Sequence, residues 1–350
     1  MTTPPVTSPL QAAIVKLAHH SAITAEDATE AFGVIMRGEA TELQVAALLT
    51  GLRVRGESAE IVAGVVRALR DVMVRMPAEN PDELVDTCGT GGGAVTTFNI
   101  STAAALLAAG AGVRIAKHGN RSFTSRCGSA DVLEALGVPL DVPVETMSAA
   151  LASAGIVFMY APLMHPAMRH VGPVRRELAI PTVMNVVGPL ANPAGARRQV
   201  VGVADAQRVP ILAGALLELD SLHSLVVHGE PGLDEISPLG PTSVVEVRDG
   251  QTTEWTIDPE EFGYKGFAPE DLGGGDSGDN ARIITDSLTS ARSNAGSPAA
   301  RAAIVMNAAG AIYVSGKVGK YSDAVALAQQ ALESGAGLAA LERLRRAYAR

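Results

Sequence analysis

The chain has 350 residues, and 47% of them are apolar, so it can bury the core of one large domain or of two domains of ordinary size. Its formal net charge of −9 argues against a protein that wraps nucleic acid, since such proteins favour a basic face. The two cysteines, Cys88 and Cys127, form no Cys-x-x-Cys pair and exclude a disulfide framework, so a reduced cytoplasmic protein is expected.

The first part of the chain, residues 8 to about 75, is predicted to be helical throughout. Thr24, Thr41 and Ser58 each precede a run of helix-forming residues and are expected to cap its first turn. Prolines follow the last of these patterns, and the residue types change after them. We therefore place a domain boundary near residue 78.

The next part of the chain alternates between strands and helices. A strand at 84–87 leads through a glycine loop to a helix at 101–109 and a second strand at 113–116, which is the pattern of a βαβ unit in a parallel sheet. The alternation continues with helices at 129–136, 146–154 and 209–219 and strands at 156–159, 199–204 and 224–227. The predicted fold class is α/β, a small all-helical domain followed by a larger α/β domain with a mainly parallel central sheet.

The last part of the chain begins with a predicted hairpin over 244–257, because two β-rich runs flank Asp249 and Gly250. Residues 273–278 are predicted to form a surface loop, and three helical stretches are predicted to close the chain. No internal repeat is present. The sequence begins without the basic and apolar runs of a secretory signal, and no apolar run reaches the roughly 20 residues that span a bilayer, so we expect no membrane partner.

A glycine loop and the helix after it form the first candidate site. Four glycines in five residues follow a strand directly, which lets the backbone approach a ligand closely. Free N–H groups and the dipole at the start of the helix favour an anion there, and hydroxyl groups add donors. These features predict a phosphate cradle, although a glycine-rich turn before a well-capped helix would give the same pattern. The loop is neither a Walker A motif nor a dinucleotide-binding fingerprint.

A second candidate element follows the next strand, where the sequence reads Lys117-His118-Gly119-Asn120-Arg121-Ser122. Cations and hydroxyls at the carboxyl end of a parallel strand lie where open α/β sheets bind ligands, so Lys117 and Arg126 are predicted to meet phosphate charge. The alternative is a solvated basic loop. His118 is a candidate general base, a hydrogen-bond donor or a structural residue, and the scattered histidines argue against a zinc site.

Taken in order, these motifs resemble the anthranilate phosphoribosyltransferase family. The resemblance rests on Gly89-Thr90-Gly91-Gly92, Asn99-Ile100-Ser101-Thr102, Lys117 to Ser122, Gly128 to Gly137, His165 to Met168, Val174 to Leu178, Asn185 to Pro193 and Gly232 to Glu235. It implies a helical domain of residues 1–78, joined by 172–198, and a hinged α/β domain of residues 79–171 and 199–350. It also implies binding of phosphoribosyl pyrophosphate (PRPP), anthranilate and Mg²⁺, a homodimer joined through the helical domains, and a role in tryptophan synthesis.

The resemblance assigns roles to individual residues. The residues implied to bind PRPP are Gly89, Gly91, Gly92, Gly93, Thr97, Asn99, Ser101, Thr102, Lys117 and Ser129. Those implied to bind anthranilate are Gly89, His118, Asn120 and Arg175, and those implied to bind Mg²⁺ are Ser101, Asp234 and Glu235. Adjacent carboxylates suit a hard cation, although without the resemblance Asp234 and Glu235 would be interpreted as a solvated acidic turn.

Arg175 has independent support from its position. Pro173 is a good first helical residue, so Arg175 is expected in the first turn, where a cation is slightly unfavourable unless a ligand anion compensates it. Arg175 and Arg176 point about 100° apart on a helix. Only one of the two is therefore expected to face the site.

The sequence also departs from the family pattern. Gly93 stands where the family usually carries Asp, Met164 where a second histidine often precedes His165, and Phe123-Thr124 and Arg126-Cys127 replace commoner pairs. We expect the loop to bind PRPP with altered kinetics, because Gly93 removes a carboxylate beside the reacting centre.

Three alternatives remain open at this point. One is a relative of the same fold with another acceptor, and a second is a pyrimidine nucleoside phosphorylase, which would need free phosphate instead of PRPP. The third is a non-catalytic nucleic-acid-binding relative, which the net charge of −9 disfavours.

Overall fold

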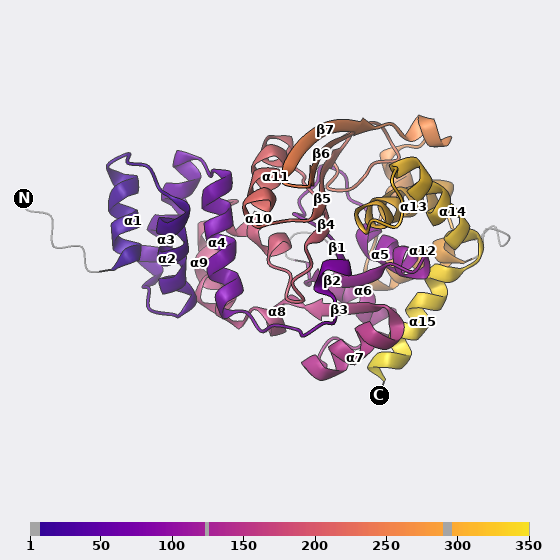
Figure 1. The fold of residues 1–350 in the computed structure, drawn as a ribbon, viewed down its shortest axis with the longest axis horizontal. Coiled ribbons are helices and arrows are strands. Elements are labelled where there is room, and N and C mark those ends of the chain that lie inside the picture. Colours follow the sequence, from indigo (N-terminus) through magenta and orange to yellow (C-terminus); the bar gives the residue numbers. More distant parts are fainter. Residues whose placement is uncertain (1–7, 123–125, 290–295, 350) are drawn as a thin grey trace, which may run out of the picture.

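The computed structural model describes residues 8–122, 126–289 and 296–349, and Figure 1 shows its ribbon. Four helices form the N-terminal part: α1 Pro9–Ala18, α2 Ala25–Met36, α3 Glu42–Arg55 and α4 Ala59–Val72. Thr24, Thr41 and Ser58 each accept a hydrogen bond from a backbone N–H in the first turn of the following helix, and the first two form capping boxes. The helical character predicted for this part is confirmed.

A seven-stranded sheet forms the centre of the larger part. Its strands are β1 Leu84–Gly89, β2 Arg114–Gly119, β3 Ile156–Tyr160, β4 Arg198–Gly202, β5 His223–Gly229, β6 Thr242–Arg248 and β7 Gln251–Ile257. The order is β3-β2-β1-β4-β5-β6-β7. The first five strands are parallel, and β6 and β7 add an antiparallel edge, so the sheet is mainly parallel as predicted.

The remaining helices are α5 Ile100–Gly110, α6 Ser129–Ala135, α7 Val144–Ala154, α8 Ala161–Met164, α9 Gly172–Leu178, α10 Met184–Val187, α11 Val209–Glu218, α12 Ser277–Leu288, α13 Pro298–Val314, α14 Tyr321–Glu333 and α15 Ala336–Tyr348. Short 3-10 turns lie at Pro81–Glu83, Pro166–His170, Gly188–Leu190, Ala206–Arg208, Pro259–Phe262 and Pro269–Leu272. Helices α5 and α12–α15 lie on the side of the sheet away from α1–α4, while α10 and α11 lie between α4 and the sheet (Figure 1). No helix among the described residues is both long enough and apolar enough to cross a membrane.

Successive residues of the central strands face two different apolar cores. On β4, Val200 belongs to the core under α5 and α13, and Val201 belongs to the core that includes α2–α4 and α11. On β5, Val227 belongs to the first of these cores and Val226 to the second. This alternation follows from the two-residue period of a strand. It buries both faces of the sheet, as a parallel sheet requires.

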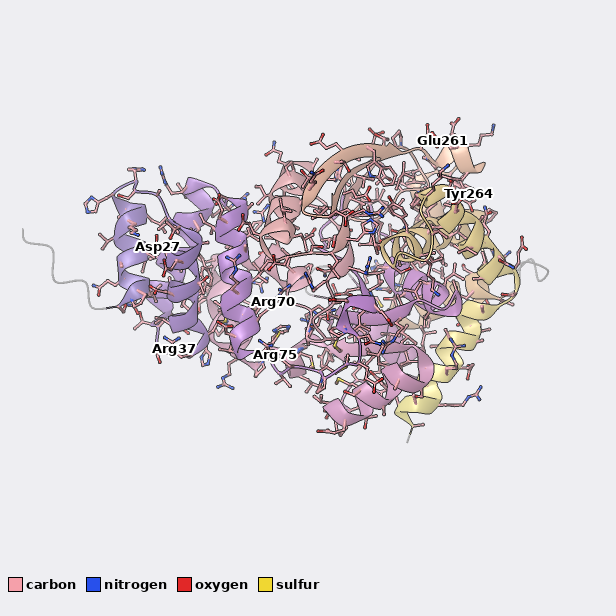
Figure 2. The ribbon with its side chains drawn as sticks, viewed as in Figure 1. Asp27, Arg37, Arg70, Arg75, Glu261 and Tyr264 are labelled. Atoms are coloured by element: carbon pink, nitrogen blue, oxygen red, sulfur yellow. The ribbon has the colours of Figure 1, made fainter. Side chains whose placement is uncertain are left out.

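Segments from the middle of the chain pack against the helical part. Helix α9 packs against α3, and α10 packs against α4. Arg70, on the side of α4 toward the sheet (Figure 2), donates to the carbonyl oxygen of Leu190 through Nη2 at 2.6 Å and through Nε at 3.2 Å. The backbone N–H of Met76 donates to the carbonyl oxygen of Pro193. Residues 73–76 and 188–193 therefore run side by side where the helical part meets the sheet.

Three sequence predictions need correction. Strand β2 extends to Gly119, so Lys117 and His118 lie on a buried strand instead of in a loop after it. Helix α12 begins at Ser277, inside the predicted surface loop, because Asp276 caps it through the N–H of Asp279. Four helices, α12–α15, close the described part of the chain instead of three. The hairpin between β6 and β7 is confirmed, with positive φ at Asp249 and Gly250.

Candidate functional site

The glycine loop after β1 folds back onto the segment that follows β5. Gly91 and Gly92 have φ of 70° and 79°, a conformation that favours glycine. The N–H of Gly91 donates to Oδ2 of Asp234 at 2.8 Å, and the N–H of Ala94 donates to the carbonyl oxygen of Gly232 at 2.9 Å. Because β1, β4 and β5 are neighbours in the sheet, the glycine loop after β1 and the segment 232–235 after β5 meet at its carboxyl edge.

Close backbone approach brings Asp234 against two strand ends. A Cβ on Gly89 would lie 2.5 Å from Oδ2 of Asp234, and one on Gly202 would overlap the carbonyl oxygen of Asp234. Both positions are far inside van der Waals contact, so the segment can pack here only because Gly89 and Gly202 have no side chain. Gly202, at the end of β4, was not among the predicted site residues.

The carboxylate of Glu235 lies at the first turn of α5, where the sequence predicted an anion site. The N–H of Ser101 donates to Oε1 of Glu235 at 3.0 Å. Burial raises the pKa of Glu235 to about 8, and the neighbouring Asp234 charge adds to the shift. Burial also raises the pKa of Asp234, while the bond from Gly91 opposes that shift. The carboxyl group of Glu235 therefore occupies the backbone donor of Ser101 at the helix start, and burial beside Asp234 disfavours its charged form.

Lys117 supplies positive charge from inside the sheet. Its Nζ donates to the carbonyl oxygen of Thr87 and, at 3.2 Å, to Oγ of Ser101. Only 3% of the residue is exposed, and burial lowers its pKa while the charges of Asp86 and Glu235 oppose that shift. Lys117 therefore connects β1 to the first turn of α5 from below the glycine loop, a position that the predicted basic loop did not anticipate.

Sequence reasoning missed a buried polar cluster next to Lys117. Asp86 accepts hydrogen bonds from the N–H of His118 at 3.2 Å and from Nδ2 of Asn192 at 2.8 Å. Asn192 also donates to the carbonyl oxygen of Ala116. Burial raises the pKa of Asp86 to about 6. An acidic residue within the predicted 84–87 strand was the available signal, since buried carboxylates in strands need partners.

His118 lies against a second histidine. The ring centroids of His118 and His165 are 4.9 Å apart, and both residues are buried. Burial lowers the pKa of His118 to about 3 and that of His165 to about 4, so both rings are neutral at pH 7. A histidine with so low a pKa is a weak base. Of the roles considered for His118, those of a neutral hydrogen-bonding group and of a structural residue fit this environment best.

The loop after β2 is tied to the start of α5. Nδ2 of Asn99 donates to the carbonyl oxygen of Cys127 at 3.1 Å, and Oγ of Ser129 donates to the carbonyl oxygen of Asn120 at 3.3 Å. Oδ2 of Asp131 accepts from the N–H groups of Gly128 and Ser122 and so closes the loop at its base. Residues 123–125, which include the unusual Phe123-Thr124 pair, lie outside the described residues.

The predicted residues separate into two groups. Direct contacts join Gly89, Gly91, Ser101, Lys117, Asp234 and Glu235 to one another. The amide of Asn99, at the start of α5, instead bonds Cys127 and Asn280. Thr102 is buried, and its hydroxyl has no hydrogen-bond partner among the described residues. No contact described in the structure links Thr97 or Arg175 to the glycine loop. Arg175 lies half-buried on α9 without a described side-chain hydrogen bond, whereas Arg176 is exposed.

The oxygen donors at this edge fit a hard cation. Asp234 and Glu235 are adjacent, partly buried carboxylates, and Lys117 is the buried cation that faces them. No cluster of three or more histidine, cysteine or acidic side chains suited to a metal occurs among the described residues. Two carboxylates with substrate phosphates are the usual environment of Mg²⁺, which rarely has an all-protein site. The residues present therefore fit a magnesium ion shared with a phosphorylated ligand.

Comparison with known proteins finds relatives that match this chain over almost its whole length. Residues 11–73 match the helical bundle domain, and residues 81–338 the a/b domain, of a glycosyl transferase family. Anthranilate phosphoribosyltransferase from Rubrobacter xylanophilus is 52% identical over 95% of this chain and 96% of its own length. The corresponding protein from Thermomicrobium roseum is 47% identical over 91% of both chains.

Solved structures agree with these sequence matches. Anthranilate phosphoribosyltransferase from Thermus thermophilus superimposes with a TM-score of 0.90 at 40% identity, covering 97% of this chain and 99% of its own. The Saccharomyces cerevisiae enzyme in complex with PRPP and Mg superimposes with a TM-score of 0.85 at 28% identity, covering 97% and 98%. With this identity and coverage, and with the glycine loop, Lys117 and the carboxylate pair meeting at one sheet edge, the chain belongs to the anthranilate phosphoribosyltransferase family.

Proposed function

We propose that the chain transfers the 5-phosphoribosyl group of PRPP to the amine of anthranilate. The products are pyrophosphate and N-(5-phosphoribosyl)anthranilate, an intermediate of tryptophan biosynthesis. The observation that carries this proposal is the meeting of the glycine loop, Lys117 and the Asp234–Glu235 pair at the first turn of α5. Relatives named for this activity match almost the whole chain, which supports the same reaction.

The leaving group determines what the site must do. Pyrophosphate carries most of the negative charge as it departs, so the site needs donors that are fixed before the reaction begins. The N–H groups of Gly92 and Gly93, which have no hydrogen-bond partner among the described residues, would supply neutral donors. Lys117 would supply a positive charge, and its Nζ is held by Thr87 and Ser101. Gly92, Gly93, Thr97, Thr102 and Ser129 complete the proposed PRPP contacts. The aromatic amine is already a nucleophile, which agrees with the low pKa of His118.

Asp234, Glu235 and the hydroxyl of Ser101 would hold Mg²⁺. The ion, when bound, would neutralise pyrophosphate oxygens and stabilise the charge of the leaving group. The Saccharomyces cerevisiae relative has been solved with PRPP and Mg, which supports this assignment. Glu235 must lose its proton to bind the ion, and its raised pKa links that step to pH.

Arg175 would bind the carboxylate of anthranilate, with Gly89, His118 and Asn120 along its path. A guanidinium is suited to a carboxylate because its donors match the two oxygens. The half-buried Arg175 lacks a described protein partner, whereas Arg176 points to solvent, which supports the choice of Arg175. The Saccharomyces cerevisiae relative has also been solved with 4-fluoroanthranilate, a close analogue of the proposed acceptor.

We also propose the domain division given by the sequence, 1–78 with 172–198 against 79–171 with 199–350, and a cytoplasmic homodimer. The packing of α9 on α3 and of α10 on α4 supports the division. Leu43 and Val54 on α3 are 83% and 79% exposed, and Ile180 after α9 is 42% exposed, so the helical part presents apolar side chains suited to a partner. Leu43→Glu is expected to shift the chain from dimer to monomer in sedimentation analysis, and an unchanged dimer would contradict this interface.

The test of the main proposal is loss of anthranilate fluorescence after addition of PRPP and Mg²⁺. The controls omit PRPP or add EDTA. Loss that requires both additions is expected. If fluorescence persists while calorimetry shows PRPP binding, the phosphate site is right and the acceptor is wrong. Phosphate-dependent cleavage of a nucleoside would then identify a phosphorylase.

A further inference from the structure

A buried asparagine outside the predicted site contacts the start of α5. Asn280, in the first turn of α12, is 1% exposed. Its Nδ2 donates to Oδ1 of Asn99 at 2.8 Å, and its Oδ1 accepts from the N–H of Gly275 at 2.8 Å. Asn99 continues the series by donating from Nδ2 to the carbonyl oxygen of Cys127. Two side-chain amides therefore join three segments that are far apart in the sequence.

The direction of this series is fixed at both ends. A backbone N–H can only donate, so Gly275 requires the oxygen of Asn280 on its side. The amide nitrogen of Asn280 then faces Asn99 and requires the oxygen of Asn99 there. A backbone carbonyl can only accept, so Cys127 requires the nitrogen of Asn99 at the other end. Rotation of either amide by 180° would break at least two hydrogen bonds, and Oδ1 of Asn99 also accepts from Sγ of Cys127 at 3.3 Å.

The backbone before α12 packs against Phe98, just before the start of α5. The N–H of Phe98 donates to the carbonyl oxygen of Leu272 at 3.0 Å. A Cβ on Gly274 would lie 2.8 Å from Cα of Phe98, so the absence of a side chain lets the two segments touch. The residues before α12 therefore pack against Phe98, next to Asn99. The side chain of Asn280, in the first turn of α12, makes the hydrogen bond to the Asn99 amide.

We propose that Asn280 is a positioning residue for PRPP, which fixes the orientation of the Asn99 amide. An amide nitrogen has two hydrogens, and the Cys127 carbonyl takes one of those on Asn99. The second remains a donor for a phosphate or ribose oxygen. The inference rests on the proposed function, in which Asn99 contacts PRPP. It assigns to α12 a role in substrate binding through a hydrogen bond instead of through direct contact.

The test uses Asn280→Asp, which keeps the shape of the side chain and its bond with Gly275 but places an acceptor opposite Oδ1 of Asn99. We expect the Kd of PRPP, measured by calorimetry with Mg²⁺, to rise by about 10- to 100-fold, the range for a hydrogen bond to a charged group. The anthranilate KM should change less than about twofold, the error range for an uncoupled site. Asp286→Asn, an exposed change on the same helix, is the matched control and should leave the Kd of PRPP unchanged.

A double-mutant cycle separates positioning from general stabilisation. If Asn280 acts through Asn99, the Asp change should have little further effect on PRPP affinity in an Asn99→Ala background. An equal fold-change in both backgrounds would overturn the inference. Lowering the pH toward 5 should reduce the defect of Asn280→Asp relative to the parent chain, because a protonated carboxyl can donate again. A structural defect would lack that recovery.

Two outcomes distinguish this inference from the function on which it rests. If Asn99→Ala leaves PRPP affinity unchanged, the proposed role of Asn99 fails and the positioning role fails with it. If Asn99→Ala weakens binding and Asn280→Asp does not, only the positioning role fails. If Asn280→Asp does not fold, Asn280→Ala replaces it in the same double-mutant cycle. The positioning role again requires weaker PRPP binding in the parent background and little further effect in the Asn99→Ala background.

Discussion

A substitution at Gly93 tests how a further carboxylate at this sheet edge changes the stability of the protein and its affinity for Mg²⁺. The proposed change is Gly93→Asp, which restores the residue that the family usually carries. Its matched control is Gly93→Ala, which adds the same Cβ without a charge. The φ of Gly93 is not positive, so the backbone dihedral allows a side chain. The Cβ would press on the carbonyl oxygen of Gly232 equally in both variants, so the Ala control removes this steric effect from the comparison.

The magnitude follows from the position of the added atoms. A Cβ at residue 93 would lie 3.0 Å from the carbonyl oxygen of Gly232 and 3.4 Å from Oδ1 of Asp234. Two like charges about 4 Å apart repel by about 4 kcal/mol at an effective dielectric of about 20, and the half-buried position reduces this to about 1–2 kcal/mol. Bound Mg²⁺ reverses the sign, because a further carboxylate then attracts the ion. We expect about tenfold tighter Mg²⁺ binding for about 1.4 kcal/mol.

The assay compares the Asp and Ala variants in two conditions. In EDTA the Asp variant should unfold at lower denaturant concentration than the Ala variant. With PRPP present, calorimetry should show the Asp variant saturating at lower Mg²⁺. Identical behaviour of the two variants in both conditions would refute the reasoning. Unchanged kcat and KM for both substrates would mean that position 93 does not influence the reaction in this chain.

Three further predictions follow from the site. Lys117→Met should lower the free energy of unfolding by about 3–5 kcal/mol, because it leaves the buried carboxyl groups of Asp86 and Glu235 without the neighbouring positive charge. A loss below about 1 kcal/mol in denaturant unfolding would contradict this electrostatic role of Lys117. The pKa of Glu235 is raised from 4.5 to about 8, so its contribution to stability in EDTA is complete below pH 4.5 and is lost as the pH rises through about 8. Unfolding measured from pH 4 to pH 9 should show this decline in the parent chain but not in Glu235→Gln. Arg175→Ala should raise the anthranilate KM at least tenfold, whereas Arg176→Ala should leave it unchanged. If initial rates show equal effects of the two changes, Arg175 does not bind the anthranilate carboxylate.

Local signals predicted much of the fold. Thr24 and Thr41 were recognisable as helix caps because a hydroxyl group, followed at fixed spacing by the carboxyl of Asp27 or the amide of Gln44, satisfies the first N–H groups of a helix. Asp249 and Gly250 marked the hairpin because both accept positive φ. The strand and helix alternation gave the parallel sheet. These features depend on residues close together in sequence, which is why pattern alone was sufficient.

The errors arose where distant contacts decide the structure. Lys117 was predicted to lie beyond the strand, which was expected to end at residue 116. Its buried place on β2 is stabilised by hydrogen bonds to Thr87 and Ser101 and by the charges of Asp86 and Glu235, none of which is close to it in sequence. The contact between Glu235 and Ser101 joins residues of different elements and left no pattern in the sequence. The glycine loop, Lys117 and the carboxylate pair were each identified from sequence, while their arrangement came from the sheet order.

The order of the strands also sets the time at which the site can form during synthesis. Strand β1 lies between β2 and β4, and its register pairs Thr87 with Val200. The centre of the sheet therefore stays open on one side until the ribosome has released the chain beyond β4. Asp234 and Glu235 arrive later still, after β5. Pairings between residues so distant in sequence form slowly, so the glycine loop of the nascent chain stays without its contacts to Asp234 and Glu235 until late in synthesis. Premature termination before Glu235 leaves an unpaired strand edge, which is prone to aggregation.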